Sequence, residues 1–446
     1  MEGKEEKWGR DVAMRSVFAA NGKSWVPLLM GAMPLGVALL TVAACTPVAL
    51  RAHVGTSCVL SALAFWWTRS LIPVISSKIP ATKRGCDLLK RPVRSKIGEA
   101  DRNVPESLGI VSGVALVCAL VLTQVSTETP AFAHDYAAAM LCIVFAVLLG
   151  FVDDFLDLEW KYKYVLPPIM SLPLLSAYDG GTRVVPPKFC RAALLETPLG
   201  TALDAVIAPL FGGAVDGASG VVDLGLAYKI YMVLLAVFCT NAINIYAGVN
   251  GLECGQTYAI ACAILAMSAV ELGRAADSDN YDATKNHLFA VTLMLPFAAT
   301  TLALLRSNWF PANVFVGDTF TNYAGMTLAV VAILAHFPIM LVLLMFPQLL
   351  NFLYSFPQLF GMRPCPRHRL PSFDPVTGRL RASRVNDRAD LVPPHRDSFN
   401  LTLINAALRI CGPLTEPALA TILVVFQLLC CIAALALRFS LVGHVY

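Results

Sequence analysis

Five short polar segments stand out in an otherwise apolar chain of 446 residues. They are G-C-D-L-L-K at 85–90 with Glu106, D-D-F-L-D at 153–157, the long N-A-I-N to G-L-E segment at 241–253, F-V-G-D-T at 315–319 and C-P-R-H-R at 365–369. Carboxylate, amide and guanidinium groups are the side chains that handle phosphates and divalent cations. All five segments fall in alternate loops between apolar spans, so they face the same side of a membrane. The pattern predicts an active site at a bilayer surface.

Adjacent carboxylates end one apolar run. Asp153 and Asp154 are followed one helical turn later by Asp157, with Lys163 beyond. A single aspartate at the end of a span is commonly only a solvated boundary. Three of them concentrate negative charge at the lipid surface, and a divalent cation with hard oxygen ligands, Mg²⁺ or Mn²⁺, would relieve the repulsion.

Two asparagines lie near the end of the apolar run 230–248. The structural alternative for Asn241 and Asn244 is a hydrogen bond between two membrane helices, because an unpaired amide is costly there. The segment continues A-G-V-N-G-L-E-C-G-Q, in which glycines at 248, 251 and 255 free the backbone for a tight polar loop. Such a loop can bring amides close to a nucleotide.

Asp318 follows Gly317 and begins the next span. Its structural alternative is a helix N-cap in G-D-T. Its functional interpretation is a metal ligand that completes an oxygen-rich site with Asn244. Mg²⁺ keeps several waters and takes further ligands from substrate phosphates, so two protein ligands suffice.

The most basic loop carries Arg367, His368 and Arg369 within P-C-P-R-H-R-L-P. Basic residues beside a membrane commonly contact anionic headgroups. Prolines on both sides stiffen this segment, however, and guanidinium groups match diphosphate oxygens bidentately. The F-D-P-V-T-G-R-L-R that follows has the Pro and Gly of a hairpin turn. We therefore predict a small cytosolic β-hairpin flap near 364–384 that carries the R-H-R corner over the site.

The elements that must position these segments are membrane helices. Hydrophobic residues make up 57% of the chain and charged residues 14%, a composition that excludes an ordinary soluble protein. A crossing takes about 17 to 25 apolar residues. Such runs occur at 25–50, 54–77, 108–126, 136–152, 164–178, 230–248, 257–272, 287–305, 319–335, 337–360 and 417–437.

These runs predict an all-α polytopic membrane protein with about ten transmembrane helices and an additional N-terminal span. Residues 1–53 form an N-terminal extension, whose long charge-free stretch exceeds the apolar core of a signal peptide. Residues 54–446 form one membrane domain that includes the cytosolic loop 361–412. Lys and Arg concentrate in the motif-bearing loops, above all 78–107 and 361–412, which assigns those loops to the cytosol.

Taken in order, the segments resemble the eukaryotic UDP-N-acetylglucosamine:dolichyl-phosphate N-acetylglucosaminephosphotransferases. The resemblance covers about residues 54–446 and rests on the strings at 149–163, 238–256, 308–319, 347–358 and 364–371. It implies the ten-helix fold of the polyprenyl-phosphate N-acetylhexosamine-1-phosphate transferases. The C-P-R-H-R corner is typical of the eukaryotic branch.

The resemblance also implies roles for individual residues. Residues matching Asn244 and Asp318 ligate Mg²⁺ in the family, and those matching Asp153 and Asp154 lie at the catalytic centre. Lys163 and Arg367 match catalytic positions near the diphosphate. The substrate-binding set comprises Leu88 and Glu106 at the nucleotide pocket, Asn250 near uracil, His368 and Arg369 in the sugar-recognition loop, and Asp157 and Glu253.

The implied reaction transfers N-acetylglucosamine-1-phosphate from UDP-N-acetylglucosamine to dolichyl phosphate and releases UMP. This is the first step of dolichol-linked oligosaccharide synthesis for N-glycosylation, and tunicamycin is the expected inhibitor. The expected location is the endoplasmic reticulum membrane with the site facing the cytosol. The expected partners are the two substrates and the bilayer, without nucleic acid, and a homodimer is left open.

Two alternatives stay open at the level of the sequence. One is a related transferase that uses another polyprenyl phosphate or another sugar. The other is a polytopic transporter, since many spans with intramembrane Asn and Asp suit one. Charged groups that cluster at one surface, rather than at the bilayer midplane, argue against transport.

Overall fold

The computed structural model describes residues 26–86, 103–127, 132–158, 160–186, 188–196, 198–217, 219–366, 369–374, 376–385 and 399–445. The longer helices are α2 (Val26–Cys45), α3 (Arg51–Lys78), α4 (Gly109–Ser126), α5 (Ala133–Leu156), α10 (Leu226–Ile245), α11 (Leu252–Asp277), α12 (Tyr281–Asn308), α13 (Gly317–Leu334) and α17 (Glu416–Val445). Shorter helices are α6 (Trp160–Met170), α7 (Leu172–Ala177), α8 (Lys188–Glu196), α9 (Leu199–Phe211), α14 (Pro338–Leu344), α15 (Phe346–Leu359) and α16 (Leu403–Cys411).

The all-α polytopic fold class is confirmed, since each predicted apolar run contains a helix or a pair of helices. Within the described residues, seven helices are long and apolar enough to cross a membrane, or eight if α14 and α15 count as one bent span. The run 337–360 is not one straight span, because α14 and α15 meet at 73°. The runs 25–50, 164–178 and 319–335 are helical but do not meet the same test of length and apolarity.

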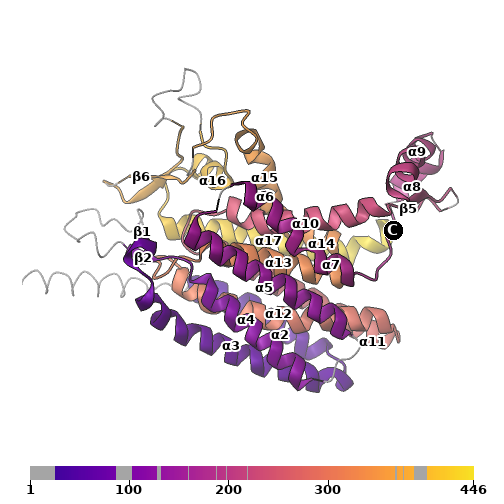
Figure 1. Ribbon diagram of the computed structural model, residues 1–446, viewed down its shortest axis with the longest axis horizontal. Helices are drawn as coiled ribbons and strands as arrows, with labels where there is room; N and C mark the ends of the chain where they lie inside the picture. Colours follow the sequence, from indigo (N-terminus) through magenta and orange to yellow (C-terminus); the bar gives the residue numbers. More distant parts are fainter. Residues whose placement is uncertain are drawn as a thin grey trace, which may run out of the picture.

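The long helices lie side by side along the longest axis of the molecule (Figure 1). Two antiparallel hairpins lie at one end: β1 (Arg84–Cys86) with β2 (Asn103–Pro105), and β6 (Ser372–Asp374) with β7 (Arg379–Arg381). The second hairpin falls inside the flap predicted at 364–384. We call this end the site end. Helices α8 and α9 lie at the opposite end, the far end (Figure 1).

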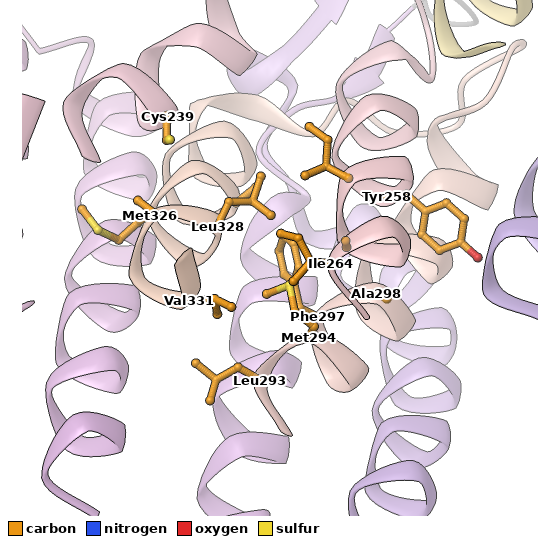
Figure 2. Packing of buried hydrophobic residues seen from close by; sticks show 14 of the residues in the cluster. Cys239, Tyr258, Ile264, Leu293, Met294, Phe297, Ala298, Met326, Leu328 and Val331 are labelled. Carbon is orange, nitrogen blue, oxygen red and sulfur yellow. The ribbon is translucent and has the colours of Figure 1, made fainter. Parts of the chain in front are cut away.

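The core is built around α12 and α13. In the apolar stretch of α12, 94% of the residues are buried, as expected for a helix that is apolar on every side. It packs against α3 and α11, while α13 packs against α5 and α10. Figure 2 shows side chains of this cluster, including Phe297, Met326 and Val331, converging between the helices.

The contact between α5 and α13 is a close approach of two backbones. A Cβ added at Gly150 of α5 would lie 2.5 Å from the Cα of Thr319. Glycine at this position therefore lets the end of α5 reach the beginning of α13. Both helices carry acidic motif residues at this point of contact.

A small sheet lies at the far end, in the segment 179–229 between the apolar runs 164–178 and 230–248. Its strands are β3 (Arg183–Val184), β4 (Ala214–Val215) and β5 (Val222–Asp223), in the order β3-β5-β4. Helices α8 and α9 belong to the same segment. The segment lies far from the polar motifs (Figure 1).

Candidate active site

Backbone pairing at the site end joins two of the motif segments. The N–H of Phe315 donates to the carbonyl of Pro105 (2.9 Å), and the N–H groups of Leu108 and Gly109 donate to the carbonyls of Phe315 and Val316 (3.0 and 2.9 Å). This ladder places Glu106 beside the F-V-G-D-T segment. Residues two hundred positions apart thereby share one end of the bundle.

Asp154 binds the N-terminus of α13. Its Oδ1 accepts from the N–H of Asp318 (2.8 Å), and its Oδ2 accepts from the N–H (3.0 Å) and the hydroxyl (2.5 Å) of Thr319. The Ser107 side chain adds a further hydrogen bond. The first N–H groups of a helix lack partners within the helix, and its positive dipole end favours a carboxylate. Asp154 therefore caps α13 from a different helix.

Gly317 is required by this arrangement. Its φ is +73°, a left-handed conformation that favours glycine, and an added Cβ would lie 2.4 Å from Oδ2 of Asp154. The cap position of α13 is Val316, which makes no side-chain capping bond. The N-cap alternative for Asp318 is therefore wrong, because Asp154 performs the capping and leaves the Asp318 side chain to face another helix.

That other helix is α10. The Nδ2 of Asn244 donates to Oδ1 of Asp318 at 2.9 Å, so the two predicted metal ligands lie within hydrogen-bond distance. Asn241, by contrast, donates to the carbonyl of Val237 in its own helix. Within the described residues there is no group of three or more His, Cys, Asp or Glu side chains that could hold a metal. One carboxylate and one amide are the donors that this position offers.

Lys83 and Glu106 extend the site beside Asp154. The Nζ of Lys83 donates to the backbone carbonyl of Asp154 (3.0 Å). Burial raises the pKa of Glu106, the nearby Asp154 raises it further, and Lys83 opposes the shift. No motif in the sequence singles out Lys83, because its place beside Asp154 depends on the pairing of β1 with β2.

The remaining acidic residues of the D-D-F-L-D segment end α5. Asp153 is buried and accepts from the N–H of Leu158 (3.2 Å). Asp157 is exposed, has a left-handed φ of +50° and terminates the helix. Lys163 belongs to α6, but its side chain is outside the part of the chain that the structure describes.

The loop after α10 is fixed by buried polar side chains. The N–H of Asn250 donates to Oε1 of Glu416 (2.8 Å), and the N–H of Gly251 donates to Oδ1 of Asn308 (3.0 Å). Glu253 accepts from the N–H of Gly248 through Oε1 (3.2 Å). Glu253 thus holds its own loop, a positioning role beside the substrate-binding role predicted for it. Sequence analysis missed Asn308 and Glu416, which carry no motif of their own.

The basic corner packs against this loop. Leu370 lies so close to Gly248 that an added Cβ would meet its Cδ2 at 2.5 Å. The neighbouring Arg369 is half-buried, and burial lowers the pKa of its guanidinium group. Leu88, Arg367 and His368 lie outside the described residues. The structure therefore brings together Asp154, Asp318, Asn244 and Glu106. It places Leu370, the chain neighbour of Arg369, against the loop that follows α10.

Comparison with known proteins agrees with a transferase site in a membrane-helix bundle. The model of the Glycosyl transferase family 4 matches residues 136–336, the stretch that contains Asp153, Asp154, Asn244 and Asp318. The fold and site thus define a polytopic membrane glycosyl transferase. The chain belongs to the UDP-N-acetylglucosamine--dolichyl-phosphate N-acetylglucosaminephosphotransferase family.

The relatives that show this family cover most of the chain. The Dictyostelium discoideum protein of that name is 42% identical over 84% of this chain and 87% of its own length. The Saccharomyces cerevisiae protein is 38% identical over 69% of both chains. A phospho-N-acetylmuramoyl-pentapeptide-transferase of Bacillus velezensis is 26% identical over 58% of this chain and 74% of its own. The predicted resemblance is confirmed.

Proposed function

We propose that the protein transfers N-acetylglucosamine-1-phosphate from UDP-N-acetylglucosamine to dolichyl phosphate, forming dolichyl-diphosphate-N-acetylglucosamine and UMP. The observation that carries this proposal is the pairing of Asn244 with Asp318 at 2.9 Å, beside the carboxylate of Asp154. The related transferases named above carry this activity in their names. Neither a transporter nor another acceptor is favoured by them.

The donor set fits a hard divalent cation, and we propose Mg²⁺, with Mn²⁺ as a substitute. Asn244 and Asp318 each carry an oxygen, come from two different helix ends, and leave most ligand positions to water and phosphate. When bound, the cation supplies charge neutralisation for the diphosphate. The amide and carboxylate hold that charge where the two substrates meet.

The reaction joins two anions, so alignment and charge compensation matter more than a strong base. A phosphate oxygen of dolichyl phosphate attacks the β-phosphorus, a new P–O bond forms, and the bond to the bridging oxygen of UMP breaks. We propose direct attack without a covalent enzyme intermediate. Both oxygens of Asp154 already accept hydrogen bonds from α13, which lowers their nucleophilicity.

Other side chains take roles around this centre. We assign charge compensation to Lys163 and Arg367. We assign to Asp153 the role of an ionisable carboxyl group near Asn244 and Asp318. The proposed substrate contacts are Leu88, Glu106 and Asn250 for the nucleotide, His368 and Arg369 for the sugar, and Asp157 and Glu253 for the loops that frame them. The proposed setting is the endoplasmic reticulum membrane, with the site end toward the cytosol, in keeping with the Lys and Arg content of its loops.

The test uses membranes that express the protein, supplied with dolichyl phosphate, Mg²⁺ and UDP-N-acetylglucosamine labelled in both the sugar and the β-phosphate. Both labels should enter the lipid extract while UMP appears in the aqueous phase. Tunicamycin and Asp318→Ala should each abolish the product. Sugar label alone with UDP would indicate a plain glycosyl transfer and contradict the proposal.

A further inference from the structure

Four polar side chains form a stripe along α15. Gln348, Asn351, Ser355 and Gln358 recur every three or four residues and therefore share one face of the helix. All four are buried, whereas Leu353 is 57% exposed. A buried amide or hydroxyl is costly unless it is hydrogen-bonded. The partners of this α15 polar stripe therefore show what the stripe holds in place.

Asn351 holds the end of the helix that carries Asn244. Its Nδ2 donates to the carbonyl of Ile245 (3.2 Å), the last residue of α10 and the chain neighbour of Asn244. Its Oδ1 accepts from the N–H of Leu403 (2.8 Å), at the beginning of α16. The Asn351 amide thus connects the end of α10 that carries Asn244 to the segment that follows the flap.

Gln348 reinforces the same point through α11. Its Nε2 donates to Oε1 of Gln256 (2.6 Å), and Gln256 donates in turn to the carbonyl of Tyr246 (3.0 Å). The carbonyls at the end of α10 have no partners within the helix. Amides from α11 and α15 supply those partners, which fixes the direction in which α10 ends.

The other end of the stripe holds the chain around the basic corner. Oε1 of Gln358 accepts from the N–H of Leu401 (2.7 Å), and its Nε2 donates to the carbonyl of Pro364 (3.0 Å). The hydroxyl of Ser355 donates to the carbonyl of Leu401 (2.6 Å). Pro364 is the first residue of P-C-P-R-H-R-L-P, so Gln358 anchors the corner where it leaves α15.

The other boundary of the corner, Arg369, is held by the segment that follows the flap. The Nδ2 of Asn405 donates to the carbonyl of Arg369 (3.1 Å), and Nη1 of Arg369 reaches the carbonyl of Leu401 (3.5 Å). The R-H-R corner is therefore bounded by Pro364 and Arg369, and both boundaries lead back to residues held by α15.

We propose that the α15 polar stripe is the positioning element that sets the basic corner relative to the metal-bearing end of α10. Asn351 and Gln358 are positioning residues that act at its two ends. The proposal rests on the proposed function, in which Asn244 holds the cation and the corner recognises the sugar. It adds that metal affinity and sugar recognition are each controlled by a different amide of one helix.

The experiment measures ligand protection against heat unfolding in detergent, which requires no turnover. Asn351→Leu and Gln358→Met remove the hydrogen bonds while keeping the length of the side chain. Thr327→Val is the matched control, because the Thr327 hydroxyl is buried and, among the described residues, bonds only to the carbonyl of Tyr323 in its own helix. Each protein is titrated with Mn²⁺ in the presence of UMP, and then with UMP and UDP-N-acetylglucosamine at saturating Mn²⁺.

Each variant should change one ligand response. Asn351→Leu should raise the Mn²⁺ concentration for half-maximal protection about tenfold, as expected for the lost hydrogen bond to the carbonyl of Ile245. It should leave the preference for UDP-N-acetylglucosamine over UMP unchanged. Gln358→Met should leave the Mn²⁺ response unchanged and lower that preference about tenfold. The control should keep both within about twofold of wild type.

A merely structural stripe would give a different result. Both variants would then unfold at lower temperature without ligand, while both ligand responses stayed as in the wild type, and the proposal would be overturned. If a variant does not fold, Asn351→Ala and Gln358→Ala remove the same hydrogen bonds without a larger apolar side chain or a buried charge, and are judged by the same two responses. Wild-type membranes that form no lipid product would contradict the proposed function alone, since the protection assay does not depend on transfer.

Discussion

Asp154→Asn separates a positioning role from a chemical role for this carboxylate. The substitution keeps the shape of the side chain but replaces one acceptor oxygen with an NH₂ donor. Both oxygens of Asp154 face N–H groups of α13, at 2.8 Å from Asp318 and 3.0 Å from Thr319. Either orientation of the new amide therefore sets a donor against a donor.

The expected cost follows from these contacts. A partly buried N–H that loses its acceptor costs about 1–3 kcal/mol, and the bond lost is one to a charged acceptor. The favourable interaction of a negative charge with the positive end of α13 is lost as well, about 0.3–1 kcal/mol. The variant should therefore be destabilised by about 1–4 kcal/mol at this end of the bundle.

The assay compares thermal unfolding in detergent with protection by Mn²⁺ and UMP. Asp154→Asn should lower the unfolding temperature and also weaken the protection, because Asp318 is the second residue of the helix that loses its cap. Asp157→Asn is the stability control. That residue is exposed with a left-handed φ, a conformation that asparagine tolerates well, so its unfolding temperature should match the wild type.

A loss of activity without a loss of stability would refute the positioning role of Asp154. If Asp154→Asn loses transfer activity but keeps the wild-type unfolding temperature and Mn²⁺ protection, the carboxylate acts on substrate rather than on α13. If a small base added to the assay restored activity to Asp154→Asn, that result would support the same conclusion.

Three further predictions address the same end of the bundle. Gly317→Ala should lower the unfolding temperature and the activity more than Gly361→Ala does. Both glycines have a φ near +70°, but of the two only Gly317 would bring an added Cβ against a neighbour, Oδ2 of Asp154. Glu106→Gln should raise the unfolding temperature at neutral pH: the pKa of Glu106 is raised, so its stabilising contribution is present at low pH and lost as pH rises through that pKa. The gain should shrink as a pH series is lowered through that pKa, and a difference that stays constant over the series would contradict the prediction. Chelation with EDTA should stop transfer, Mg²⁺ or Mn²⁺ should restore it, and Asp318→Ala should not respond to either ion.

The arrangement of the site was largely readable from the sequence. Alternation of apolar runs and polar loops predicts that the motifs share one end, and Asn244 and Asp318 are within hydrogen-bond distance there. The hairpin flap follows from Pro and Gly between short β-prone strings, and β6 and β7 form it. The roles of the individual residues stay predictions.

The partners of the polar residues could not be read in the same way. Asp154 ends one helix and caps another that begins more than 160 residues later, and nothing local distinguishes it from Asp153. Lys83 depends on the pairing of β1 with β2. The bend between α14 and α15 could not be predicted, because hydropathy gives the composition of an apolar run and not the direction of its helix axis. The spacing of the α15 polar stripe predicts one polar helix face, but it does not predict which groups that face contacts.

The charge of the site end explains why α13 matters to the chemistry. Asp154, Asp318 and Glu106 lie close together, and a diphosphate would add further negative charge. The N-terminus of α13 compensates part of the charge on Asp154 through backbone N–H groups, which cannot leave with a product. Asp154 is thereby occupied before substrate arrives, so the charge of the diphosphate must be compensated by a cation at Asn244 and Asp318 and by basic side chains. A site built this way should depend on its metal for binding as well as for transfer, and UMP should therefore protect the protein against heat only when a divalent cation is present.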